Sequence, residues 1–325
     1  MTVASEITRI YGVRSDIFDA ITAKGVTVPE GSKLADCPTL IGQITGGDTP
    51  APAMPAMTLR LLFPDGVTPT FSKGTATQVS ASPNIWDLYY NNTNWSKLCY
   101  NQYTLLKVIA VGDTSTVTDM TNLFGNCNSL ESVPLFDTSS VTSMDYMFQY
   151  DGTLTSIPQF NTSSVTRMQG MFRSCYALRS VPLLDMSNVT LAGTMFQYCS
   201  ALNSVPLFDF SSLTSANNMF QYCYSLLNIP LFNTENVTNM SYMFSTCLSV
   251  SKIPLLNTTK ATNMGYMFDG CKNVTQGALA LYQQAANQTT PPTSHSYTFR
   301  NCGSNTVSGA AELAQIPSSW GGTAA

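Results

Sequence analysis

Cysteine is the residue of this chain whose spacing most invites a chemical interpretation. Six thiols recur at multiples of 24 residues, and they are Cys127, Cys175, Cys199, Cys223, Cys247 and Cys271. A zinc site needs cysteines or histidines grouped at short spacing, and the chain holds a single histidine, His295. The nine cysteines are odd in number, so they cannot all form disulfides. We therefore interpret the series as reduced thiols that fill one buried slot per repeat.

Asp151 occupies the one position of this series that lacks a thiol. A carboxylate is rarely buried without a partner. We therefore expect Asp151 to lie on the surface, where the sequence Tyr-Asp-Gly-Thr-Leu would bulge outward as a turn.

A second series carries a side-chain oxygen at the same 24-residue spacing. Its members are Asp113, Asp137, Asn161, Asp185, Asp209, Asn233 and Asn257. Calcium prefers several oxygen ligands, but only four of these residues are charged. Asp and Asn also bond nearby backbone in turns, and we expect that role here.

Catalytic chemistry has little support in the sequence. No serine or cysteine has a histidine placed to activate it, and no carboxylate pair recurs at a spacing typical of a glycosidase. We therefore expect no enzymatic activity and no cofactor or metal. A polysaccharide-degrading tail spike remains the least favoured alternative.

The composition narrows the class of partner. Of 325 residues, 44% are hydrophobic and only 10% are charged, against about 25% charged in an ordinary soluble domain. The net charge is −4 and no basic cluster is present, which argues against nucleic-acid binding. No apolar run approaches the ~18 residues of a membrane span, and the N-terminus lacks the pattern of a secretion signal.

The 24-residue period extends to many other positions. Met-Phe begins at Met147, Met171, Met195, Met219, Met243 and Met267, and Pro recurs at Pro134, Pro158, Pro182, Pro206, Pro230 and Pro254. A fixed period of this length is typical of a solenoid. Val-Pro-Leu-Phe and Val-Thr-x-Met indicate short strands, and Met-Phe-x-x-Cys indicates one helical turn. We expect an α/β repeat solenoid in which the recurring residues are interior and the changing ones are surface.

The repeat resembles the BspA-like branch of the leucine-rich repeats. The line "NTENVTNMSYMFSTCLSVSKIPLL" carries the core of that branch, Val-Thr-x-Met-x-x-Met-Phe-x-x-Cys. The resemblance covers residues 105–275. It implies a curved right-handed solenoid used for surface attachment and not for catalysis.

Tyrosines at positions outside the repeated core form the candidate recognition surface. They are Tyr146, Tyr150, Tyr176, Tyr198, Tyr222, Tyr224, Tyr242 and Tyr266. Arg167 joins them, because it stands at the variable position after Val-Thr. Amphipathic rings on a polar surface suit carbohydrate or protein recognition, although about half of them could simply lie flat on the flank of the solenoid.

The ends of the array predict caps. We assign residues 57–104 to an N-terminal cap, with a hairpin around Pro64-Asp65-Gly66 and a short helix within 83–95. Cys99-Tyr100 aligns with Met-Phe as a degenerate first repeat, which puts Leu106 and Ile109 at the core positions. Residues 276–325 form a C-terminal cap, with a helix in "GALALYQQAANQ" and a last repeat restored at Phe299 and Cys302.

The N-terminal segment, residues 1–46, has a different pattern. A heptad seam runs through Val3, Ile7, Ile10, Ile17 and Ile21. Isoleucine at both core positions favours trimers or tetramers, although so few heptads also fit a helix packed on its own chain. A Gly/Pro linker at 47–56 separates this segment from the rest.

The string "ASEITRI…KGVTVPEGSKLADCPTLIGQI" resembles N-terminal segments of virion proteins, especially fibre-type proteins of phages of gut bacteria. It implies a helical anchor that binds other virion proteins. We therefore expect a homotrimeric phage fibre or decoration protein, made in the host cytoplasm and exposed on the virion surface. It would adhere to a host-surface carbohydrate or protein, and a BspA-like adhesin of the bacterial cell surface is the alternative.

Overall fold

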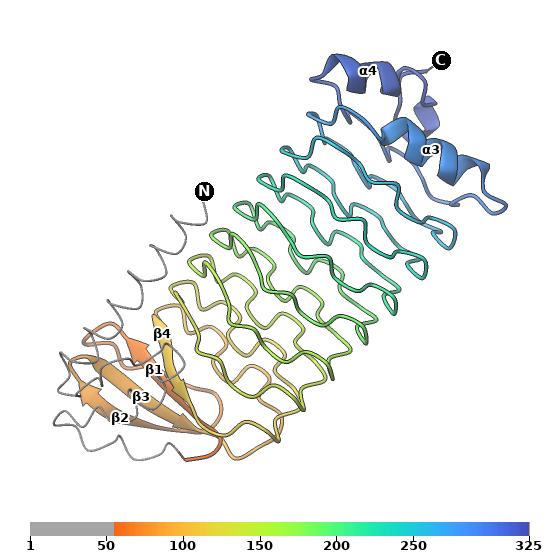
Figure 1. The fold of residues 1–325 in the computed structure, drawn as a ribbon. Helices are drawn as coiled ribbons and strands as arrows, with labels where there is room; N and C mark the ends of the chain where they lie inside the picture. Colours follow the sequence, from red (N-terminus) through yellow and green to blue (C-terminus); the bar gives the residue numbers. More distant parts are fainter. Residues whose placement is uncertain (1–54, 325) are drawn as a thin grey trace, which may run out of the picture. The chain divides into compact units, whose positions relative to one another are not determined.

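The computed structural model describes residues 55–324. The chain divides into two compact units, residues 1–54 and residues 55–325. The predicted anchor, its isoleucine seam and most of the linker therefore lie outside the described residues. The second unit contains a small sheet, a stack of coils and two helices (Figure 1).

A four-stranded sheet covers the first coil. Its strands are β1 (Thr58–Phe63), β2 (Thr75–Ala81), β3 (Asn84–Tyr89) and β4 (Lys107–Val111). Their order is β2-β3-β1-β4, and all pairs are antiparallel. β1 turns Leu59, Leu61 and Phe63 into the core, as the alternation of its sequence requires.

Two local expectations for this cap are wrong. The aromatic stretch expected to be helical forms β3, because its apolar residues alternate and pack against β1 on one face of the sheet. The turn at Pro64-Asp65-Gly66 does not close a hairpin either. β1 pairs with β3 and β4, while the hairpin joins β2 to β3.

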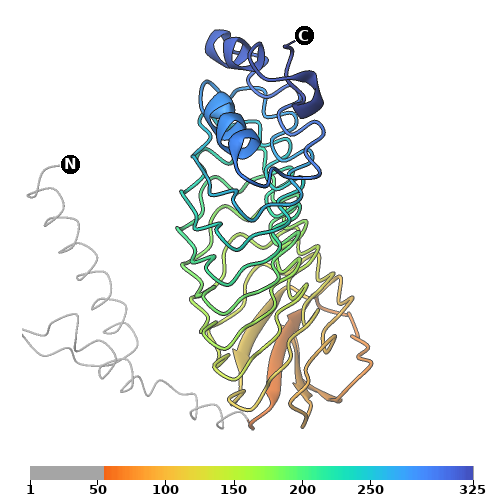
Figure 2. The ribbon, with the colours of Figure 1, turned by 90° about the vertical axis from the view of Figure 1, so that its right-hand side faces the viewer.

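The coil stack, residues 93–302, is built by backbone hydrogen bonds between successive coils. The amide of each core Phe donates to the carbonyl of the next coil, as in Phe172 to Met195 and Phe196 to Met219, at 2.9 and 2.8 Å. Parallel bridges link positions such as Arg167 and Leu191. Figures 1 and 2 show the coils lying one above another. The chain thus has a repeat fold of predominantly β type with few helices.

The expected short strands and short helix within each coil are absent from residues 112–276. The bridges of the stack stay isolated, and the Met-Phe-x-x-Cys segment is a run of turns. A residue with positive φ stands on each side of Met-Phe, as at Tyr146 and Tyr150, and this interrupts any helix. Proline removes a donor from the Val-Pro-Leu run, which therefore forms no ladder.

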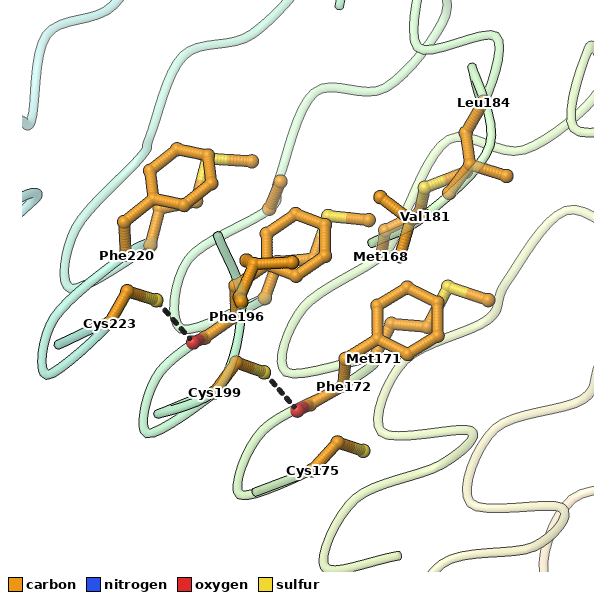
Figure 3. Close-up of a cluster of buried hydrophobic side chains, with 14 of the residues drawn as sticks. Met168, Met171, Phe172, Cys175, Val181, Leu184, Phe196, Cys199, Phe220 and Cys223 are labelled. Carbon is orange, nitrogen blue, oxygen red and sulfur yellow. Dashed lines mark hydrogen bonds between the residues drawn. The ribbon is translucent and has the colours of Figure 1, made fainter. Parts of the chain in front are cut away.

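The predicted interior is confirmed at its centre (Figure 3). The rings of Phe172, Phe196 and Phe220 are fully buried and stack nearly parallel, with centroids 5.4 and 5.3 Å apart. The same stack continues in both directions, from Phe124 to Phe299. Each coil therefore buries its ring against the coils on both sides.

The six thiols of the cysteine series are all buried and unpaired, as the spacing predicts. Each donates to a main-chain carbonyl of the preceding coil, for example Cys199 Sγ to Phe172 O at 3.0 Å and Cys223 Sγ to Phe196 O at 3.2 Å (Figure 3). Burial raises the pKa of the Cys271 thiol to about 12. These thiols are neutral, weak donors inside the core.

Asp151 contradicts the expectation of an exposed turn, because its side chain is fully buried in the cysteine slot. Its Oδ1 accepts the Cys127 amide at 2.8 Å, and its Oδ2 has no partner. Burial raises the pKa of this carboxyl well above its usual range, and the bond from Cys127 only partly opposes that effect. The backbone of the coil places residue 151 in the buried cysteine position, and the Asp151 side chain is therefore buried despite its polarity.

Two recurring positions are exposed, which corrects the rule that repeated residues are interior. The threonine found in every coil bonds on the surface: Thr166 donates through its amide and its Oγ1 to Thr142 O, at 2.9 and 3.2 Å. The leucine that follows five of the six recurring prolines also faces outward, for example Leu207. The repeated threonine forms hydrogen bonds between coils at the surface. The repeated leucine is apolar and nevertheless exposed.

The first coil is one residue longer than the others, which shifts its register. Hydrogen bonds align Cys99 with Phe124, so Cys99 takes the Phe slot and Tyr100 is partly exposed. Leu105 and Val108 are buried, whereas Ile109 is 43% exposed. Cys99-Tyr100 is therefore not the equivalent of Met-Phe, because a tyrosine hydroxyl needs a polar partner that this core lacks.

The C-terminal end adds α3 (Ala278–Asn287), α4 (Val307–Leu313) and the 3₁₀ helix η2 (Ser318–Trp320). The expected helix corresponds to α3, and the restored repeat is confirmed by the buried Phe299 and Cys302. Trp320 closes the stack: its carbonyl accepts the Phe299 amide at 2.9 Å, and its ring stacks on His295.

Candidate recognition surface

Two rows of residues with left-handed backbone run along the coil stack. Row 1 is the position before Met-Phe, and row 2 lies four residues later. Row 1 contains Asn122, Tyr146, Gly170, Thr194, Asn218, Tyr242, Tyr266 and Tyr297. Row 2 contains Asn126, Tyr150, Ser174, Tyr198, Tyr222, Thr246, Gly270 and Asn301. Every member has φ between 54° and 74°, so the coil geometry imposes this conformation whatever the side chain.

Tyrosine is an unfavourable choice for these rows. Left-handed backbone costs an L-residue roughly 1–2 kcal/mol, and glycine or asparagine bears it best. Gly170 illustrates the favourable choice, because a Cβ there would lie 2.4 Å from the ring of Tyr146. Tyrosine nonetheless occupies seven of the sixteen positions. Backbone strain of this kind concentrates where a side chain has a function.

Ring stacking offsets part of that strain. Tyr198 stacks on Tyr222 and Tyr242 stacks on Tyr266, with centroids 4.6 Å apart in both pairs. A stacked aromatic pair contributes about 0.5–1.5 kcal/mol. Each ring covers a face of its neighbour. The phenol hydroxyl of each tyrosine can both donate and accept a hydrogen bond.

A cluster that the sequence analysis missed ends row 1. Tyr297 continues the stack beyond Tyr266, at 5.2 Å between centroids. The guanidinium of Arg300 lies 5.4 Å from the Tyr266 ring and 4.8 Å from the Tyr297 ring. It also forms a bidentate ion pair with Asp269, at 2.8 and 2.7 Å. The 31-residue step from Tyr266 to Tyr297 hides this continuation from a search at fixed period.

Near Tyr150, in the middle of the rows, the polar side chains are only partly hydrogen-bonded, unlike the Arg300 cluster. Arg173 belongs to the coil that follows Tyr150, and its guanidinium lies 6.0 Å from the Tyr150 ring. Its Nε is buried and has no partner in the structure, and the same is true of Thr194 Oγ1 and Gln197 Oε1. Gln197 donates through Nε2 to Gln221 at 2.6 Å. Three buried polar atoms beside the tyrosine rows are therefore left without a hydrogen-bond partner, which is rare in proteins.

The remaining predicted site residues lie at other positions of the coil. Arg167 is on the row of parallel bridges and binds the largely buried Asp145 at 2.7 Å. Tyr176 and Tyr224 share a third position and are 51% and 40% exposed. The Tyr224 ring meets Tyr222 edge-on at 6.1 Å. The structure thus brings six of the eight predicted tyrosines into the two rows.

The Asp/Asn series has the turn role that we expected. The side-chain oxygen of each member accepts a backbone amide two residues later, as in Ser139 to Asp137 at 2.8 Å and Ser163 to Asn161 at 3.1 Å. Hydrogen bonding from Ser139, first through its side chain and then through its amide, lowers the pKa of the Asp137 carboxyl. Within residues 55–324 no group of three His, Cys, Asp or Glu side chains is arranged to hold a metal ion.

Burial shifts the pKa of three titratable side chains near the rows. Partial burial raises the pKa of Tyr242, with Tyr266 as the next cause, and burial raises that of Tyr146 beside Asp145. Burial against Trp320 lowers the pKa of His295.

Across the described part of the chain, no helix is long and apolar enough to cross a membrane.

Comparison with solved structures finds a leucine-rich repeat protein from Eubacterium ventriosum. The two chains share 18% sequence identity with a TM-score of 0.31, over 46% of this chain. The match spans about half of that protein, 48% of its length. No curated protein matches this sequence.

A family model matches residues 93–206 and 199–306, which together make up well over half of the chain. The match begins where the coils begin, since the first bridge of the stack joins Asn94 to Asp119. It ends just after Asn301, the last member of row 2. The chain therefore belongs to the family described as "Mycoplasma protein of unknown function, DUF285".

Proposed function

We propose that this protein is a non-catalytic adhesion protein, a fibre or decoration protein of a phage particle. In this proposal the coil stack is a leucine-rich-repeat solenoid of the BspA-like type, and the N-terminal segment attaches it to other virion proteins as a homotrimer. Rows 1 and 2 contact a carbohydrate or protein on the host surface.

The observation that carries the proposal is the placement of tyrosine at seven left-handed positions. The fold alone favours asparagine or glycine there. Tyrosine adds amphipathic area and a hydroxyl at a low cost in side-chain entropy, and it is enriched at recognition surfaces. The low charge of the chain, 10%, fits a partner that is bound through hydrogen bonds and apolar contact.

The resemblance of the coils to BspA-like repeats also fits an adhesin of a bacterial cell surface. The two candidates share the recognition surface and differ in where the protein is attached. The N-terminal resemblance to fibre proteins favours the particle, so immunogold labelling of lysates and cells should place the protein on phage particles. Labelling restricted to bacterial envelopes would favour the adhesin.

Binding and catalysis can be separated in one assay. The full chain is incubated with intact gut bacteria and with their purified surface polysaccharides, and both bound protein and polysaccharide length are measured. We expect retention on at least one cell type or polysaccharide, with the polymer length unchanged. Shortening of a polysaccharide would contradict the proposal and favour a degrading tail spike.

A further inference from the structure

A stripe of exposed leucines runs along the coil stack at the position after each recurring proline. This leucine stripe consists of Leu135, Leu183, Leu207, Leu231 and Leu255, whose exposed fractions are 64%, 57%, 62%, 63% and 56%. Gln159 takes the same position in the remaining coil, and its Nε2 donates to Leu183 O at 2.7 Å. The stripe is apolar, exposed and unrelated to the tyrosine rows.

The size of the stripe sets it apart from scattered surface leucines. A leucine side chain has on the order of 100 Å² of apolar area, so the four consecutive leucines from Leu183 to Leu255, each about 60% exposed, leave roughly 240 Å² in one row, and Gln159 separates Leu135 from them. The largest apolar patch of a soluble monomer is of this order of size, and it is often functional. A specific interface needs about 800 Å² per partner, with an apolar centre and a polar rim. The stripe is large enough to form that centre.

We propose that two copies of this chain associate side by side, leucine stripe against leucine stripe, about a two-fold axis parallel to the stripe. Adjacent coils are held by backbone hydrogen bonds, so the leucines repeat at about the 4.8 Å spacing of β structure. A second copy presents the same spacing over the same length. The axis pairs each leucine with itself and places Gln159 opposite Gln159, which makes the surface self-complementary.

The charges beside the stripe agree with this arrangement. The chain crosses the stripe at Leu183 with Arg179 before it and Asp185 after it, and both charged residues are exposed. The two-fold axis exchanges the two sides, so Arg179 of each copy faces Asp185 of the other. The residues that correspond to Arg179 beside Leu207 and Leu231 are Asn203 and Leu227, which are uncharged. At the end of the stripe, beside Leu135, the axis brings Glu131 of one copy opposite Asp137 of the other, and Lys107 of the same copy neutralises Glu131 through an ion pair at 3.1 Å.

Disulfide trapping in the full chain tests the register directly. Leu207→Cys should form an intermolecular disulfide under mild oxidation, because each residue 207 faces its own copy. The matched control is Val79→Cys, which is 50% exposed on β2, away from the stripe. We expect covalent dimer for Leu207→Cys, and only the wild-type background for Val79→Cys. Equal trapping of the two variants would overturn the proposal.

Light scattering gives an independent measurement that separates this contact from assembly through the N-terminal segment. Leu207→Gln with Leu231→Gln copies the residue that the coil already accepts at Gln159, so the melting transition should stay unchanged. The mass of the assembly should fall by a factor of two. Arg179→Asp should weaken association, and Arg179→Asp with Asp185→Arg should restore it. An unchanged mass in the double glutamine variant would contradict the interface.

Discussion

Replacement of Asp151 by cysteine should stabilise the protein, because it restores the residue that the coil uses elsewhere. The thiol would reach a main-chain carbonyl of the preceding coil, as Cys175 does with Phe148 O at 3.0 Å. The wild-type carboxyl instead leaves Oδ2 buried without a partner. Within residues 55–324 no lysine or arginine forms an ion pair with it.

The magnitude follows from the buried oxygen that has no partner and from the raised pKa. A buried polar atom left unsatisfied costs about 1–3 kcal/mol, and at pH 7 each unit by which folding raises the pKa of Asp151 adds about 1.36 kcal/mol. The bond from the Cys127 amide returns about 1 kcal/mol. We therefore expect Asp151→Cys to raise the free energy of unfolding by about 2–3 kcal/mol at pH 7.

The sign of the pH dependence identifies the cause. Because folding raises the pKa of Asp151, its stabilising contribution is present below pH ~4 and is lost as the pH rises toward the folded pKa. The advantage of the cysteine variant should therefore be large at pH 7 and small at pH 4. Asp137, whose pKa is lowered, has the opposite trend but is common to both proteins.

Denaturant unfolding of wild type, Asp151→Cys and Asp151→Asn at several pH values measures this difference. The asparagine variant keeps an oxygen for the Cys127 amide and removes the titration, so it should share the pH-dependent part of the gain. Equal stability of wild type and Asp151→Cys at pH 7, or an advantage that does not change with pH, would refute the buried neutral carboxyl.

Three further predictions concern the core and the anchor. Phe196→Ala removes a fully buried ring stacked on both neighbours and should cost about 3–5 kcal/mol of unfolding free energy; a loss below about 1 kcal/mol in denaturant unfolding would place that ring at the surface. Cys175, Cys199, Cys223 and Cys247 are buried thiols with raised pKa and should resist thiol reagents without denaturant, whereas rapid stoichiometric labelling by mass spectrometry would contradict the interior series. Ile10→Lys with Ile17→Lys should abolish trimer formation and incorporation into particles while the melting transition of the coils stays unchanged, because an unpaired charge in an apolar seam costs several kcal/mol; normal incorporation would exclude the anchor.

The period of the sequence predicted the stack and its core because interior slots accept few residue types. Phe, Met and Cys recur where the coils bury them, and the resemblance to BspA-like repeats rested on the same residues. The period alone could not show that Leu207 and Thr166 are exposed, since residues at surface positions repeat as regularly as those in the interior. The prediction for Asp151 was wrong because it rested on the polarity of the side chain. The coil backbone buries that position whatever residue occupies it.

The backbone of the recognition surface could not be deduced from side-chain chemistry. Tyrosine gives no sign of left-handed φ, and only the Asn and Gly members of the rows, such as Asn122 and Gly170, hint at it. The register of the first coil was lost because one extra residue shifts Cys99 into the Phe slot. The network of Arg300 and Asp269 was hidden by the insertion that contains α3.

The binding contribution of the tyrosine rows is the most direct test of the proposed function. Replacing Tyr198, Tyr222, Tyr242 and Tyr266 by asparagine removes the rings and keeps a residue that tolerates left-handed backbone. Affinity of the full chain is measured for the bacterial cell type or surface polysaccharide that retains the wild type, with the melting temperature as control. We predict an unchanged or higher melting temperature and at least a tenfold loss of affinity. Equal affinity of the two proteins would contradict recognition through these rows.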